Sequence, residues 1–191
     1  MFNFLQFFYL KLAFFVFITP YPNNESEIHS LEKNSKPAPY LSSEVLDSES
    51  EIIEAENVFE TLADPDSRQV KKFGASSTSN NNVVAIFDKG DKIKISFSAG
   101  DSQPVKYIVK ARVRSGNVNS ASSYWPNGYL FSLDGQTITL TGDQSSLSGY
   151  TGDLGGSYWG DMVSDTLTSN DNDHYIEITA NSNWNAVDYV E

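Results

Sequence analysis

The feature that most constrains the fold is an alternation of apolar and polar residues that runs through the chain after residue 83. Residues 93–97 read Ile-Lys-Ile-Ser-Phe, the pattern of a strand with one buried face. Similar short segments follow at regular spacing, separated by turns such as Asp134-Gly135. No segment after Thr61 has a convincing helical period. The pattern predicts an all-β domain, a sandwich or barrel of antiparallel strands, without an internal repeat.

The first residues of the chain have a different character. Residues 1–18 are almost wholly apolar, with Lys11 as the single charged side chain, which fits the apolar region of a secretory signal. No basic residue precedes Phe7, and residues 19–22 offer no small-x-small cleavage site. An uncleaved anchor is therefore the alternative, and both interpretations predict export.

A polar segment separates this start from the β pattern. It is rich in Ser, Asn, Glu and Pro and cannot bury enough apolar area to offset its ordering entropy, which predicts a disordered linker. The predicted organisation is a signal peptide over residues 1–20, a linker over 21–51 and a β-sandwich over 52–191.

Composition excludes several classes of partner. The 191 residues include no cysteine, so disulfides and thiolate chemistry are excluded. The formal net charge of −12 argues against nucleic acid and against an anionic membrane, because phosphate groups are bound by clustered Lys and Arg. We expect a secreted monomer that makes no membrane contact in its mature form.

Two acidic residues at the start of the β region share one face of a predicted strand. Side chains at i and i+2 of a strand point the same way, so Glu54 and Glu56 project together while Ile53 and Ala55 face the core. Asp188 lies on the last predicted strand. If first and last strands pair, the three acids converge on a hard cation, and calcium prefers such oxygen ligands. The alternative is a pair of solvated acids at a strand start.

Three segments together resemble a known family. They are an Ile-Glu-Ala-Glu opening at 53–56, Ile-Phe-Asp-Lys-Gly-Asp at 86–91 and Val-Asp-Tyr-Val-Glu at 187–191. In this order and at these separations they resemble carbohydrate-binding modules of the family 6 and family 35 type, over residues 52–191. The resemblance implies a jelly-roll sandwich of two antiparallel sheets. It also implies a structural calcium held by Glu54, Glu56 and Asp188.

The same resemblance indicates a sugar site in the glycine-rich segment 142–160. Trp159 matches a loop tryptophan that stacks on sugar, and Tyr158, Trp184 and Asn185 are expected at the edges of the same cleft. A pyranose needs a flat apolar surface for its C–H face and amides or carboxylates for its hydroxyls.

The second half of that cleft departs from the family. Ile86 stands where a partner aromatic is expected, and Ala186 stands where a sugar-bonding asparagine is expected. Asn185 is one position away and substitutes for it if the loop is shifted. A site on a sheet face is the alternative.

An enzymatic function has little support in the sequence. His29 and His174 are the only histidines, and no Gly-x-Ser-x-Gly motif occurs. Glycosidase carboxylates act from opposite sides of a bond, unlike two acids on one strand. We predict a non-catalytic module that binds a polysaccharide or oligosaccharide, secreted alone or as part of a polysaccharide-degrading enzyme. The alternative is a calcium-stabilised structural or adhesive domain without sugar binding.

Overall fold

The computed structural model describes residues 50–98 and 104–191. The predicted signal peptide and all but the last two residues of the predicted linker lie outside the described residues. The chain divides into two units, 1–46 and 47–191, and every described residue belongs to the second. Within this described part, no helix is both long and apolar enough to cross a membrane.

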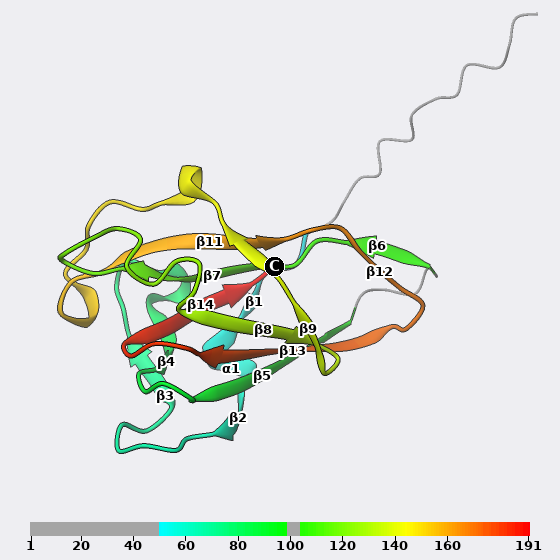
Figure 1. The fold of residues 1–191 in the computed structure, drawn as a ribbon, viewed down its shortest axis with the longest axis horizontal. Coiled ribbons are helices and arrows are strands. Elements are labelled where there is room, and N and C mark those ends of the chain that lie inside the picture. Colours follow the sequence, from blue (N-terminus) through cyan, green and yellow to red (C-terminus); the bar gives the residue numbers. More distant parts are fainter. Residues whose placement is uncertain (1–49, 99–103) are drawn as a thin grey trace, which may run out of the picture. The chain divides into compact units, whose positions relative to one another are not determined.

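The described residues form two main sheets that face each other (Figure 1). Every strand pair is antiparallel, as the sequence predicts. In spatial order, the seven-stranded sheet contains β10 (Leu140–Gly142), β11 (Tyr158–Ser164), β7 (Lys110–Gly116), β14 (Asn185–Val190), β4 (Asn82–Ile86) and β3 (Lys71–Gly74), with β1 (Ile53–Glu54) also paired to β14.

The second sheet and the short elements complete the domain. The five-stranded sheet contains β2 (Glu60–Ala63), β5 (Lys92–Ser98), β13 (Asp173–Ala180), β8 (Tyr129–Leu133) and β9 (Gln136–Ile138). A separate two-stranded sheet pairs β6 (Val105–Tyr107) with β12 (Leu167–Ser169). The helical elements are α1 (Ala55–Val58) and the 3₁₀ turns η1 (Ser79–Asn81), η2 (Gln144–Ser146) and η3 (Asp153–Gly155).

The main core lies between the two large sheets. Alternation places Ile93 and Ile95 of β5 on the inner face of one sheet, and Ala111 and Val113 of β7 on the inner face of the other. All four side chains are fully buried. Burial of each Ile or Val side chain contributes on the order of 1.5–3 kcal/mol, so this layer is a main source of stability. The predicted β-sandwich is confirmed.

One aromatic ring fixes where the strands can approach each other. Trp125 packs in the core against two glycines, and a Cβ at Gly160 or Gly142 would lie 2.3 Å or 2.6 Å from its ring. Such contacts are shorter than van der Waals separation, so β10 and β11 need glycine at these two positions.

The last strand organises the site described below. β7 pairs with β14 along residues 187–190, which occupies one edge of β14. The other edge is shared, because β4 pairs with residues 185–187 and β1 with residues 189–190. Asp188 therefore lies where β1, β4 and β14 meet.

Candidate functional site

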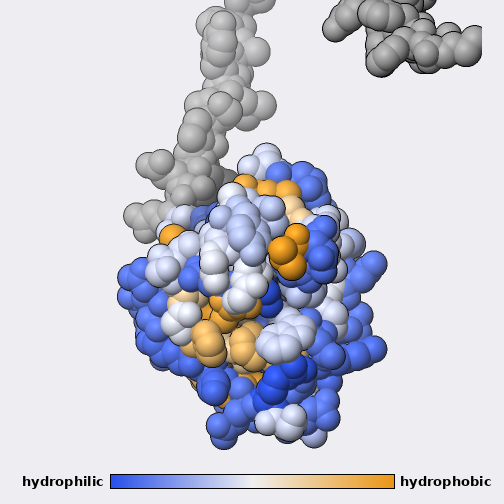
Figure 2. Space-filling model, turned by 90° about the vertical axis from the view of Figure 1, so that its left-hand side faces the viewer, coloured by the Kyte–Doolittle hydropathy of each residue, from blue (hydrophilic) through white to orange (hydrophobic). Residues whose placement is uncertain are grey.

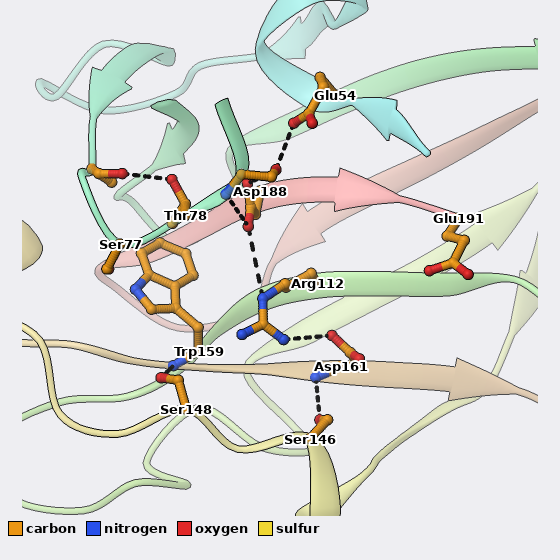
Figure 3. Close-up of polar contacts among 12 residues, drawn as sticks. Glu54, Ser77, Thr78, Arg112, Ser146, Ser148, Trp159, Asp161, Asp188 and Glu191 are labelled. Carbon is orange, nitrogen blue, oxygen red and sulfur yellow. Dashed lines mark hydrogen bonds and ion pairs between the residues drawn. The ribbon is translucent and has the colours of Figure 1, made fainter. Parts of the chain in front are cut away.

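Three carboxylates meet at this junction, beside η1. Glu54 ends β1, Glu56 lies in α1, and Asp188 lies in β14. The Ser79 hydroxyl lies 2.7 Å from Glu54 Oε2 and 2.7 Å from Asp188 Oδ1. Asn80 Nδ2 donates to Glu56 Oε1 at 2.7 Å. Figure 3 shows Glu54 and Asp188 on their separate segments, and η1 joins the three acids through two polar side chains.

This carboxylate cluster has more hydrogen-bond acceptors than donated hydrogens. The Ser79 hydroxyl carries one hydrogen, so it donates to only one of its two carboxylate partners at a time, while the Ser79 backbone N–H donates to Asp188 Oδ2 at 3.3 Å. Glu56 Oε2 is buried and has no hydrogen-bond partner among the described residues. Asp188 is 0% exposed, and burial raises its pKa to about 6. The cluster therefore lacks positive charge.

The nearest basic side chain does not supply that charge fully. Arg112 Nε lies 3.8 Å from Asp188 Oδ2, while Arg112 Nη1 donates to Asp161 Oδ1 at 2.9 Å (Figure 3). The guanidinium is divided between two carboxylates from different strands. Its attraction to Asp188 is the weaker of the two because the separation is longer.

The cluster has oxygen donors suited to a metal ion but not the arrangement of a formed site. Across residues 50–98 and 104–191, no group of three or more His, Cys, Asp or Glu side chains has the arrangement of a formed metal site. The chemistry of the cluster nevertheless fits a hard cation, because its acceptors are carboxylate oxygens and one of them is buried without a partner. The structure thus places Glu54 and Asp188 in contact with Ser79 and Glu56 in contact with Asn80, and their role as metal ligands stays a prediction.

Glu54 and Glu56 reach the cluster by a route that differs from the prediction. β1 ends at Glu54, and a single helical turn begins at Ala55, so the side-chain alternation of a strand does not apply to Glu56. The pairing of the first and last strands is confirmed, with Ile53 opposite Val190 and Glu54 opposite Tyr189.

The tryptophan expected to stack on sugar is covered. Trp159 lies on β11 and not in a loop, and its side chain is 0% exposed. It packs with Ala75, Val83 and Ala186 in a small cluster separate from the main core, and Leu154 packs against this cluster. The ring therefore presents no free face to a sugar in this arrangement, unlike the predicted role.

Asn185 and Tyr158 have different surroundings. Asn185 is fully buried, accepts a hydrogen bond from Ser182 Oγ at 2.7 Å and donates to the carbonyl of Gly128. Both ends of its amide are used inside the domain, so it does not fill the place of the expected sugar-bonding asparagine. Tyr158 is half-buried, and its ring packs edge-on against Tyr150, with the centroids 5.4 Å apart.

Among the predicted site residues, Trp184 has a partly exposed ring. It is 46% exposed and lies in the connection between β13 and β14. Its backbone has a left-handed φ of 72°, its N–H donates to the carbonyl of Phe87 at 2.8 Å, and its carbonyl accepts from Arg114 Nη1 at 2.8 Å. These two bonds hold an exposed indole in a conformation that a non-glycine residue rarely adopts.

Other side chains surround this indole. The Arg68 guanidinium lies 4.3 Å from the Trp184 ring centroid, and the Phe87 ring lies 5.3 Å away. Phe73, 38% exposed, packs edge-on against Phe87. Figure 2, which faces the left side of Figure 1, shows apolar patches set among polar surface on that face of the molecule. We call Arg68, Phe73, Phe87 and Trp184 the Trp184 surface.

Arg68 is held over this surface by an acid that the sequence analysis did not assign. Arg68 Nε donates to Asp88 Oδ1 at 2.7 Å, a second nitrogen binds the same oxygen, and the Arg68 backbone N–H donates to Asp88 Oδ2 at 2.9 Å. These hydrogen bonds lower the pKa of Asp88. The sequence contains no signal for this pair, because the two residues are 20 positions apart and belong to no shared motif.

His174 makes structural contacts. It is buried, its Nδ1 lies 2.7 Å from Asp134 Oδ2, and its Nε2 lies 2.9 Å from the carbonyl of Asp171. The Phe97 and Tyr107 rings each lie 5.5 Å from it. These contacts link β13 to the β8–β9 turn. His29 lies outside the described residues.

Comparisons with known proteins bear on the fold. No protein-family model and no curated protein matches this chain. The catalytic domain of a GH87 α-1,3-glucanase in complex with nigerose matches with a TM-score of 0.50 and 14% identity, over 73% of this chain and 27% of that chain. The chain therefore corresponds to about a quarter of that enzyme structure, and the likeness shows a shared fold.

Two similar structures are separate binding modules. The C-terminal CBM6 of a marine laminarinase from Zobellia galactanivorans has a TM-score of 0.46 and 13% identity, over 73% of this chain and 94% of that chain. A family 35 carbohydrate binding module from Clostridium thermocellum has a TM-score of 0.47 and 12% identity, over 74% of this chain and 96% of that chain.

Proposed function

We propose that residues 52–191 form a non-catalytic carbohydrate-binding module whose ligand is a polysaccharide or one of its oligosaccharides. The observation that carries this proposal is Trp184, an exposed indole fixed by two backbone hydrogen bonds at a loop end of a β-sandwich. The sequence resemblance to family 6 and family 35 modules supports the same function.

The Trp184 surface meets the physical needs of sugar recognition. A flat apolar ring packs against the C–H face of a pyranose, and a ring that is already fixed loses little conformational entropy on binding. Asn183 Oδ1 already accepts the Lys89 N–H at 3.0 Å, which fixes the amide next to Trp184. The Asn183 amide nitrogen then serves as a donor to a sugar hydroxyl. The formal net charge of −12 favours neutral glycans.

We also propose that the carboxylate cluster holds calcium. Glu54, Glu56 and Asp188 supply the carboxylates, and the Ser79 hydroxyl supplies a fourth oxygen. Bound calcium provides the missing positive charge and links β1, α1 and β14 to η1. We assign it a structural role, because Asp188 lies in the second half of β14, whereas Trp184 precedes the first residue of that strand.

The proposed function implies export. The apolar residues 1–20 remain our predicted signal peptide, and residues 21–51 remain our predicted linker. A protein that reaches the outside of the cell meets both polysaccharide and calcium, which suits both parts of the proposal.

A glycan array with the full chain tests the function. We expect wild type to bind at least one neutral polysaccharide or oligosaccharide, with nigerose included as a probe, and Trp184→Ala to lose that signal. Leu130→Ala is the matched control, because Leu130 is 52% exposed on β8 of the other sheet. Equal signals from wild type and Trp184→Ala contradict the site, and no binding to any glycan contradicts the function.

A further inference from the structure

Arg114, near the end of β7, is a buried cation that no carboxylate neutralises. It is 3% exposed, and across residues 50–98 and 104–191 no acidic side chain lies within ion-pair distance of it. Removing a guanidinium from water is costly when no opposite charge replaces the water. Packing alone does not account for an arginine here, because an apolar side chain would fill the same space without that cost.

The guanidinium binds backbone carbonyls of two connections that are distant in sequence. Arg114 Nη1 donates to the carbonyl of Trp184 at 2.8 Å, and Nη2 donates to the carbonyl of Gly156 at 2.7 Å. The Tyr124 ring lies 5.4 Å from the guanidinium carbon, within the range of a cation–π contact. Because a guanidinium is planar and rigid, bonds at both of its terminal nitrogens fix the two carbonyls relative to each other.

The bond to Trp184 holds a backbone conformation that tryptophan rarely adopts. A φ of 72° is unfavourable for a residue with a Cβ, so it persists only where the surroundings hold it. The Trp184 N–H donates to the carbonyl of Phe87, and the Trp184 carbonyl accepts from Arg114, so one bond holds each side of the residue. The bond from Arg114 is the stronger of the two, because its donor is charged. The placement of the exposed indole therefore depends on a residue that is itself covered.

We propose that Arg114 is the positioning residue of the Trp184 surface, and that it keeps the Trp184 backbone in the left-handed conformation that presents the indole to a sugar. This inference rests on the proposed function. Arg114 is covered, so it acts through Trp184 and does not contact the sugar. Without Arg114, the Trp184 backbone samples other conformations. Only the fraction with the indole in place binds, which weakens the apparent affinity in proportion.

Hydrogen exchange of the Trp184 backbone N–H, followed by NMR of the full chain, tests the positioning without a ligand. This N–H donates to Phe87 and not to Arg114, so its exchange rate reports the conformation of Trp184 and not the lost bond itself. Arg114→Met keeps a long side chain but removes its donors, and we expect the Trp184 N–H to exchange about tenfold faster. Arg114→Lys retains the charge but not the rigid fork, so its rate should lie between those of wild type and Arg114→Met.

Two controls separate positioning from a loss of overall stability. The Ala180 N–H, at the end of β13, donates to the carbonyl of Asp91 at 2.8 Å and reports on the sheet. In Arg114→Met the increase at Trp184 should exceed the increase at Ala180 by about tenfold, whereas global destabilisation raises both alike. Lys110→Met is the matched variant, because Lys110 is another cation on β7 and pairs with Glu191 at the other end of that strand.

The comparison of these rates decides the positioning. Lys110→Met should leave the ratio of the Trp184 and Ala180 exchange rates as in wild type. Equal increases at Trp184 and Ala180 in Arg114→Met overturn the proposal. If Arg114→Met does not fold, Arg114→Lys decides by the same ratio, and a wild-type ratio in that variant overturns the proposal.

Titration with nigerose, or with the glycan that an array selects, tests the consequence for binding. We expect Arg114→Met to weaken binding roughly two- to tenfold and Lys110→Met to bind like wild type. Faster exchange at Trp184 with an unchanged affinity overturns the role of Arg114 in binding and leaves the proposed function intact. No binding of any glycan by wild type overturns the proposed function, whereas the exchange rates still decide whether Arg114 holds Trp184.

Discussion

Trp159 and Trp184 lie at the same end of the sandwich, connected through Arg114, yet one is fully covered and the other is about half exposed. The difference comes from their backbones. Trp159 lies on β11, where its ring packs with Ala75, Val83 and Ala186, whereas Trp184 lies in the connection between β13 and β14 with a left-handed φ of 72°. Ring exposure, and not residue type, therefore separates a packing role from a binding role at this end.

The largest expected effect is on stability, at the covered tryptophan. Trp159→Ala should decrease the free energy of unfolding by about 3–5 kcal/mol, because it leaves a cavity among Ala75, Val83 and Ala186. Trp184→Ala should cost about 1 kcal/mol or less, because half of that ring is already in water. Urea denaturation of the full-length variants measures both. Similar decreases in the free energy of unfolding for Trp159→Ala and Trp184→Ala would contradict the distinction between a buried and an exposed ring.

The next effect concerns the carboxylate cluster. Calcium that binds only the folded state should add about 3–4 kcal/mol at concentrations of 100 to 1,000 times Kd, and chelation should therefore lower the melting temperature by several degrees. Glu56→Gln should remove this response. The control is Glu60→Gln, because Glu60 is exposed on β2 and pairs with Lys94. Identical melting with chelator and with excess calcium contradicts the metal site.

The calcium effect should depend on pH through Asp188. Its pKa is raised from 3.8 to about 6, so without metal the folded state binds this proton more tightly than the unfolded state. The free energy of unfolding without calcium should fall as the pH rises from about 4 through 6. Calcium displaces the proton, so its stabilisation should be larger above pH 6 than below it. Calorimetric melting with and without calcium, across this pH range, checks whether the free energy of unfolding changes in the expected direction.

The smallest effect should be at Asp153 of η3. Burial alone raises the pKa of Asp153, but hydrogen bonds from Ser77 and Ser76 outweigh it and the pKa is lowered. A lowered pKa means that these bonds contribute fully above pH 3.8 and weaken as the pH falls through the lower folded value. The free energy of unfolding should therefore decrease in acid, and Asp153→Asn should remove this part of the pH dependence. Urea denaturation of both proteins across this pH range measures the difference.

The sequence predicts the parts of this domain that depend on local pattern. Strand alternation indicates β5, and Asp134-Gly135 indicates the hairpin between β8 and β9, with φ of 50° and 79° in the structure. The convergence of Glu54 with Asp188 follows from the pairing of first and last strands. These features depend on the alternation of residues within one segment and on the residue types in one turn, and both can be read from the sequence.

The remaining features depend on contacts between distant segments. The hydrogen bonds that Ser76 and Ser77 donate to Asp153 join residues 77 and 76 positions apart. The helical turn that begins at Ala55 cannot be predicted from hydrophobic periodicity either, because four residues are too few to show a helical period. The left-handed φ of Trp184 is likewise not indicated by its sequence neighbours.

Isothermal titration of the full chain with the selected glycan tests the central claim most directly. Stacking on one indole is worth on the order of 1–2 kcal/mol, so Trp184→Ala should weaken binding by roughly five- to thirtyfold. We expect Leu130→Ala to bind like wild type, whose Kd should lie in the high micromolar to millimolar range, on the order of 0.1–1 mM. An unchanged Kd for folded Trp184→Ala would contradict the account, because no other predicted site residue offers as open a ring in the described structure.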